Sequence, residues 1–174
     1  MQDWTEEDRQ YANKTLRILS GLYGILCPLD GIYPYRLEMG YRFPDQQFSN
    51  LYTYWGGTLA AALPAEPLIL NLASVEYSKV VTDYIDEDRI ISPSFLTLHP
   101  TTHEPTFVVV HAKIARGAFA RWLIKERVTD AAHLRDFNDL GYMYDAHRSS
   151  PRVPVFVCKT FGGLGLSVRL QRTV

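Results

Sequence analysis

The 174-residue sequence has no long hydrophobic run and almost no net charge. A helix needs about 20 consecutive apolar residues to cross a bilayer, and no stretch approaches that length, so we expect no membrane partner. The 18 basic and 19 acidic residues give a formal net charge of -1. Because such a chain has no overall attraction for nucleic acid, any DNA contact must come from a local basic patch.

Cysteine is also scarce, and neither of the two cysteines belongs to a metal or redox motif. Cys27 and Cys158 lie far apart in apolar surroundings, with no CxxC pair and no histidine at zinc spacing. We therefore expect reduced thiols, with a disulfide as the less favoured alternative, and neither a metal site nor a cofactor. The acidic, polar amino terminus is unlike a secretory signal and favours a cytoplasmic location.

What the sequence does contain is enough apolar material for one core, since 47% of its residues are hydrophobic and 21% are charged. We predict a mixed α/β (α+β) fold, in which helices flank a mixed sheet within a single compact domain, residues 1–174. The residue patterns predict helices at 5–20, 51–63, 74 onward, 112–127 and 130–137. They predict strands at 22–26, 68–72, 89–91, 95–98, 106–110 and 153–161, with an antiparallel meander over 89–110.

The stretch Ser20–Gly40 is the densest in residues that a plain core does not require. Its glycines and prolines predict an ordered, non-repetitive loop over residues 26–36. If the chain then alternates as a strand does, Arg36 and Glu38 share one face. Two interpretations stay open: a structural ion pair, or a site in which Arg36 binds a phosphate or carboxylate and Glu38 orients it or moves a proton.

Three further polar residues lie at or just after the end of the predicted strand 68–72, a position where ligands gather in open α/β sheets. They are Asn71, Ser74 and Glu76. Glu76 joins Glu38 as a candidate acid or base. The structural alternative is that Ser74 caps a helix and Glu76 interacts favourably with the helix dipole.

The predicted helix 112–127 has an apolar stripe and a basic face. At 1.5 Å per residue its basic residues span about 21 Å, enough to follow several backbone phosphates. An ordinary solvated face is the alternative interpretation. The stripe is formed by Ala115, Ala118, Phe119 and Trp122, and the basic residues outside it are Lys113, Arg116, Arg121, Lys125 and Arg127.

Several motifs together resemble one protein family. In chain order they read LSGLYGILCPLD, PYRLEMG, LYTYWG, NLASVEY, AKIARGAFARWLI and FNDLGY, from about Trp4 to Tyr144. They resemble the bacterial YaaA-like peroxide-stress proteins. The resemblance implies a cytoplasmic protein of unusual fold that protects against hydrogen peroxide by limiting free intracellular iron. It also implies binding of double-stranded DNA through a positively charged cleft and a helix-hairpin-helix-like element.

The resemblance carries site residues but no catalytic assignment. By position it matches Arg36, Lys113, Arg116 and Arg121. Together with Arg127 of the basic face, these are our candidate anion-binding or DNA-binding residues. The other matching positions would shape the site, and those that we single out are Ser20, Gly21, Tyr23, Gly24, Asp30, Tyr35, Asn71, Ser74 and Tyr77.

The sequence departs from the family pattern in two ways. Family members usually have an amino-terminal region with an ISPAK-like strand before the first helix found here, so we expect this chain to lack that segment. Cys27 also stands where the family commonly has arginine in an LRPLD motif, which removes one positive charge.

Two functions are compatible with these residues. The first is a peroxide-stress protein that binds DNA through a local basic cleft. The alternative is an enzyme acting on a nucleotide, nucleobase or other small anionic substrate through Arg36, Glu38, Glu76 and Lys113. The first function requires Arg36, Glu38, Lys113 and Arg116 to converge on one cleft. Direct iron binding is not predicted, because the sequence has no cysteine cluster and no two-histidine carboxylate pattern.

Overall fold

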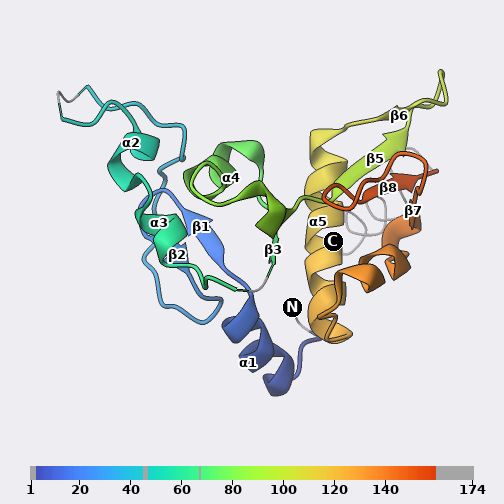
Figure 1. Ribbon diagram of the computed structural model, residues 1–174, viewed down its shortest axis with the longest axis horizontal. Helices are drawn as coiled ribbons and strands as arrows, with labels where there is room; N and C mark the ends of the chain where they lie inside the picture. Colours follow the sequence, from blue (N-terminus) through green and yellow to red (C-terminus); the bar gives the residue numbers. More distant parts are fainter. Residues whose placement is uncertain (1–2, 45–46, 67, 160–174) are drawn as a thin grey trace, which may run out of the picture. The chain divides into compact units, whose positions relative to one another are not determined.

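Helices and strands are mixed along the whole of the computed structural model, which confirms the predicted α+β class (Figure 1). The structure describes residues 3–44, 47–66 and 68–159. The chain divides into two compact units, Met1–Ile90 and Ile91–Val174. Within the described ranges, no helix is both long enough and apolar enough to span a membrane.

The first unit begins with helix α1, Glu6–Thr15, which starts where the sequence predicts and is capped by Thr5. The Thr5 hydroxyl accepts a hydrogen bond from the Asp8 amide at 3.1 Å, and the Asp8 carboxylate accepts one from the Thr5 amide at 3.0 Å. This reciprocal capping box satisfies two amides that a helix start leaves unpaired.

The end of α1 differs from the prediction, which extended the helix to Ser20. The helix ends at Thr15 because the following residues pair in a hairpin instead. Strand β1, Ile18–Ser20, lies antiparallel to β2, Gly24–Leu26, with Ser20 opposite Gly24. The strand predicted over residues 22–26 therefore corresponds to β2, which is only the second strand of this hairpin.

The segment after β2 contains no helix or strand among its described residues up to Asn50, as the glycines and prolines predicted for its first part. The predicted helix 51–63 is wrong as a single element. It is two short helices, α2, Leu51–Trp55, and α3, Thr58–Ala61. The break falls at Gly56, whose φ of 48° lies in the left-handed region that glycine adopts without steric cost.

The remaining elements of the first unit are a short strand and a helix, followed by a second short strand at the end of the unit. Strand β3, Ile69–Leu70, precedes α4, Val75–Thr82, and the short 3-10 helix η1, Glu87–Arg89, leads into β4, Ile90–Ile91, which pairs with β3. Met39 from the Ser20–Gly40 stretch is completely buried in this unit. It belongs to a core cluster with Leu51, Leu59, Val80 and Val81.

The second unit contains a four-stranded mixed sheet in the order β6-β5-β8-β7 (Figure 1). Strands β5 and β8 are parallel, whereas β6 and β7 pair antiparallel with their neighbours. The antiparallel meander predicted for residues 89–110 is therefore limited to the β5–β6 pair. The elements are β5, Ser94–Leu98; β6, Pro105–Thr106; α5, Val109–Lys125; η2, Ala131–Asp136; η3, Asp139–Gly141; β7, Tyr142–Tyr144; and β8, Val155–Cys158.

Helix α5 confirms the predicted long helix but begins at Val109, so the strand predicted over 106–110 is wrong beyond Thr106. Valines favour strands in general, yet here the sheet ends and the helix begins. The strand predicted at 153–161 is β8, and residues 160 and 161 lie outside the described part of the chain. The core between helix and sheet is aromatic, with buried Phe95, Phe119, Phe137 and Phe156.

We expect Gly21→Ala to destabilise the first unit. A Cβ atom at Gly21 would lie 2.5 Å from the Leu37 carbonyl oxygen, which is backbone and cannot move away cheaply. The expected loss is about 1–3 kcal/mol in the free energy of unfolding, measured by urea denaturation.

Gly31→Ala is the matched control, because a Cβ there meets nothing within 4 Å. It should leave stability unchanged or raise it by up to about 1 kcal/mol. Equal midpoints for the two variants would contradict the close approach at Gly21.

Candidate functional site

The segment that carries Arg36 is anchored on one side by hydroxyl groups from the β1–β2 hairpin. The buried Ser20 hydroxyl hydrogen-bonds with the Tyr35 hydroxyl and accepts from the Tyr23 amide at 3.0 Å. The Tyr33 amide donates to the Tyr23 hydroxyl at 3.2 Å. The Tyr23 and Tyr35 rings also meet edge to face, with centroids 5.4 Å apart. These contacts fix the backbone immediately before Arg36.

Helix α4 anchors the same segment on the other side. The Glu76 carboxylate accepts from the Gly40 amide at 3.0 Å. Burial raises the pKa of the Tyr77 hydroxyl, the negative charge of Glu76 raises it further, and a hydrogen bond from the Met39 backbone opposes the shift. The segment from Tyr33 to Gly40 is therefore held at both ends by side chains.

Two aromatic residues of α2 complete the anchoring, and sequence reasoning did not assign them to the site. The Trp55 indole donates to the Gly21 carbonyl at 3.1 Å. The Tyr52 hydroxyl donates to the Glu76 carbonyl at 2.7 Å. Burial, followed by the charge of Glu76, raises the pKa of Tyr52. The only available signal was the density of aromatic residues in LYTYWG.

The glycine and aspartate positions of the site act on the backbone. Gly24 has a φ of 75° and closes the β1–β2 hairpin against Trp55. The Asp30 carboxylate accepts from the Cys27 amide at 2.7 Å, which closes a turn in the loop. Neither Cys27 nor Cys158 forms a disulfide in the described part of the chain.

Arg36 and Glu38 form an ion pair that is almost fully in water. The nearest guanidinium nitrogen and carboxylate oxygen are 3.6 Å apart, and the side chains are 92% and 67% exposed. An exposed pair at this distance adds little stability, about 0–1 kcal/mol. The loop is therefore held by the hydroxyl and amide contacts and not by this pair. Arg36 stands on a fixed backbone with most of its donors facing solvent.

The residues at the start of α4 have mainly local contacts. The Asn71 side chain accepts from the Ala73 amide at 3.1 Å. Ser74 occupies the N-cap position, as its residue type indicated, but its side chain makes no capping hydrogen bond. Glu76 is exposed apart from its bond to Gly40, so its carboxylate both positions the loop and contacts solvent.

On α5 the basic residues differ in exposure more than the sequence indicated. Lys113 is exposed, whereas Arg116, Arg121 and Arg127 are half-buried. Burial lowers the pKa of Arg116. Arg127 has a φ of 52° and donates to the Ile124 carbonyl, so it closes the carboxyl end of the helix.

The structure thus assembles two sets of candidate residues, one in each unit. In the first unit, Arg36 and Glu38 lie within the framework formed by Ser20, Tyr23, Tyr35, Glu76 and Tyr77. In the second unit, α5 carries the basic set. Their convergence on one cleft stays a prediction. No group of three histidine, cysteine, aspartate or glutamate residues within the described ranges could hold a metal ion.

Comparison with known proteins gives a consistent result. Residues 1–148 match the family model described as peroxide stress protein YaaA. A UPF0246 protein of Salinispora tropica is 60% identical over 167 residues, which cover 96% of this chain and 64% of that protein. UPF0246 proteins of Roseobacter denitrificans and Ruegeria pomeroyi are 43% and 41% identical, each over 87% of this chain and 61% and 60% of their own length. The chain therefore spans less than two thirds of these relatives.

We expect Tyr35→Phe to loosen the segment that carries Arg36. The change removes the hydroxyl that meets buried Ser20, at a cost of about 1 kcal/mol in the free energy of unfolding. Amide hydrogen exchange across residues 33–38 should also become faster. Tyr33→Phe is the matched control, because that side chain is 85% exposed. A Tyr33→Phe protein as destabilised as Tyr35→Phe would refute the anchoring role.

Proposed function

The chain belongs to the peroxide stress protein YaaA family, and on that premise we propose that it protects against peroxide by binding DNA through the basic side of α5. We include in the proposal a link to limiting free iron, which the family resemblance implies. The observation that carries DNA binding is Arg116, a half-buried cation with no hydrogen-bond or ion-pair partner among the described residues.

An unpaired, partly buried cation is costly unless an anion reaches it. Burial removes part of the water that stabilises the Arg116 guanidinium, and no acidic side chain contributes to its pKa shift. A phosphate group would replace that water with charge-assisted hydrogen bonds, which guanidinium groups form in pairs. Arg116 is therefore the strongest single candidate for a phosphate contact.

The rest of α5 extends this contact into a surface. Lys113 precedes Arg116 by three residues, a spacing that places two side chains on the same side of a helix. Arg121 and Lys125 follow, and the helix Val109–Lys125 contains no acidic residue. From Lys113 to Lys125 the helix rises about 18 Å, so the surface can contact several phosphates.

We expect the double variant Lys113→Ala, Arg116→Ala to weaken binding to a double-stranded DNA fragment. Each lost phosphate contact should reduce the slope of log affinity against log salt by about 0.9. An electrophoretic mobility-shift titration at 50 and 200 mM salt measures both quantities.

Arg135→Ala is the matched control, since Arg135 is an exposed cation of η2 in the same unit. It should retain the affinity of the unaltered chain. Absence of binding at low salt, or equal loss in the control, would overturn the proposal.

A second candidate function is favoured by the geometry around Arg36. Its exposed guanidinium stands next to Glu38, with the hydroxyls of Tyr35 and Tyr77 held nearby. A nucleotide, nucleobase or other small anion could be bound by Arg36 while Glu38 or Glu76 moves a proton. This constellation contains more acid and hydroxyl groups than phosphate binding alone requires.

A thermal-shift series with nucleoside monophosphates, nucleobases and phosphorylated sugars tests this second function. A ligand present at a concentration of 100 times its dissociation constant stabilises a protein by about 2.7 kcal/mol. A compound that binds should therefore raise the melting temperature by several degrees. Arg36→Gln should abolish the shift, whereas Arg42→Gln, another exposed arginine of the loop, should not. Flat curves for every compound class would rule the function out.

A further inference from the structure

The second unit also has a cavity that the proposed DNA-binding surface does not use. Its volume is about 490 Å³, within the range of small-molecule sites. It is lined by residues of the β5–β6 hairpin, by the turn after β7 and by the end of β8. The lining of this outer cavity combines an apolar floor with polar side chains at its edge.

The floor follows from the alternation of side chains in the sheet. Phe95 and Phe156 pack against Phe119 of α5, which defines the inner face of the sheet. Leu98 is three residues after Phe95 on β5, and Val157 directly follows Phe156 on β8. Because successive side chains of a strand point to opposite faces, Leu98 and Val157 belong to the outer face of the sheet. Both line the cavity together with Met143, whose side chain is 56% exposed.

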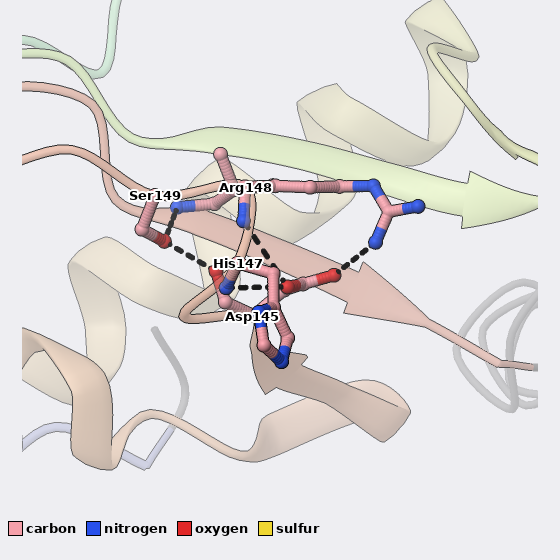
Figure 2. A network of polar contacts seen from close by, with 5 residues as sticks. Asp145, His147, Arg148 and Ser149 are labelled. Carbon is pink, nitrogen blue, oxygen red and sulfur yellow. Dashed lines mark hydrogen bonds and ion pairs between the residues drawn. The ribbon is translucent and has the colours of Figure 1, made fainter.

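The turn after β7 brings an arginine to this cavity. The Asp145 carboxylate accepts from the Arg148 guanidinium at 2.7 Å and from the His147 amide at 3.0 Å, and the Ser149 hydroxyl donates to the Asp145 carbonyl at 2.7 Å (Figure 2). The hydrogen bond from Arg148 lowers the pKa of Asp145. Figure 2 shows the Arg148 side chain extended, with only one of its terminal nitrogens directed at Asp145.

Other polar groups of the lining have no side-chain partner in the described part of the chain. They are the Lys159 ammonium, the imidazoles of His103 and His147, and the Glu104 carboxylate. Lys159 directly follows Cys158, which pairs with Thr97 on β5, so it lies at the end of β8 beside the hairpin. The lining of the outer cavity therefore contains several potential hydrogen-bond donors but only one carboxylate without a partner among the described residues, which favours an anionic ligand.

We propose that the outer cavity binds a small organic anion, with its apolar body on Leu98, Met143 and Val157 and its carboxylate or phosphate group on Lys159 and the second terminal nitrogen of Arg148. The apolar floor is complementary to the body of such a molecule, and the cationic donors are complementary to its anionic group. The site is separate from Lys113 and Arg116, so it does not depend on the proposed DNA binding.

Phenyl phosphate is the probe for this site, and a ¹⁵N–¹H correlation spectrum of the whole chain is the readout. Its addition should shift the amides of residues 98, 103, 104, 143–148 and 157–159. Benzoate tests whether a carboxylate is accepted in place of phosphate. Benzyl alcohol and inorganic phosphate, which each lack one half of the probe, should bind at least about tenfold more weakly.

Lys159→Gln should weaken phenyl phosphate binding about tenfold, the effect of losing one charge-assisted hydrogen bond. Arg135→Gln, outside the cavity, and the Lys113→Ala, Arg116→Ala double variant should bind as the unaltered chain does. Unchanged affinity in Lys159→Gln, equal binding of benzyl alcohol, or shifts located on α5 would overturn the proposal. Loss of DNA binding in the double variant with phenyl phosphate binding retained would support both functions independently.

Discussion

The first unit depends on the passage of one backbone segment directly against another. Gly21 has no side chain, and a Cβ atom there would be 2.5 Å from the Leu37 carbonyl oxygen. Because the chain passes so closely at this point, Ser20 can reach Tyr35 and Trp55 can bond to the Gly21 carbonyl. The buried Met39 then enters the core just beyond the crossing. The loop owes its shape to this steric constraint and to hydrogen bonds with Ser20, Tyr23 and Glu76.

A consequence is that the ion pair between Arg36 and Glu38 is not needed to hold the fold. Arg36 is 92% exposed, and its pairing with Glu38 contributes little stability. In the second unit Arg116 is half-buried without a partner among the described residues, while the phenylalanine cluster supplies the packing. Cations that do not stabilise the fold remain able to bind an anionic ligand. The functions proposed for this chain all depend on such cations.

Local signals predicted an element boundary where only neighbouring residues decide it. The start of α1 agrees with the prediction, since the capping box of Thr5 and Asp8 involves only neighbouring residues. The end of α1 depends on Ser20 pairing with Gly24, and the start of α5 at Val109 depends on where β6 leaves the sheet. Both are decided by competing pairing partners, for which a short sequence window contains no information.

The residue pattern alone was enough to single out Ser20–Gly40 as a candidate site, because a plain core does not require so many glycines, prolines and charged residues. It also determined that α5 has a basic face, which follows from helical periodicity. The three-dimensional structure was needed to show that Arg116 is half-buried and unpaired among the described residues, and that Trp55 and Tyr52 support the loop. Burial and partners come from contacts between distant segments, and residue spacing along the chain does not specify them.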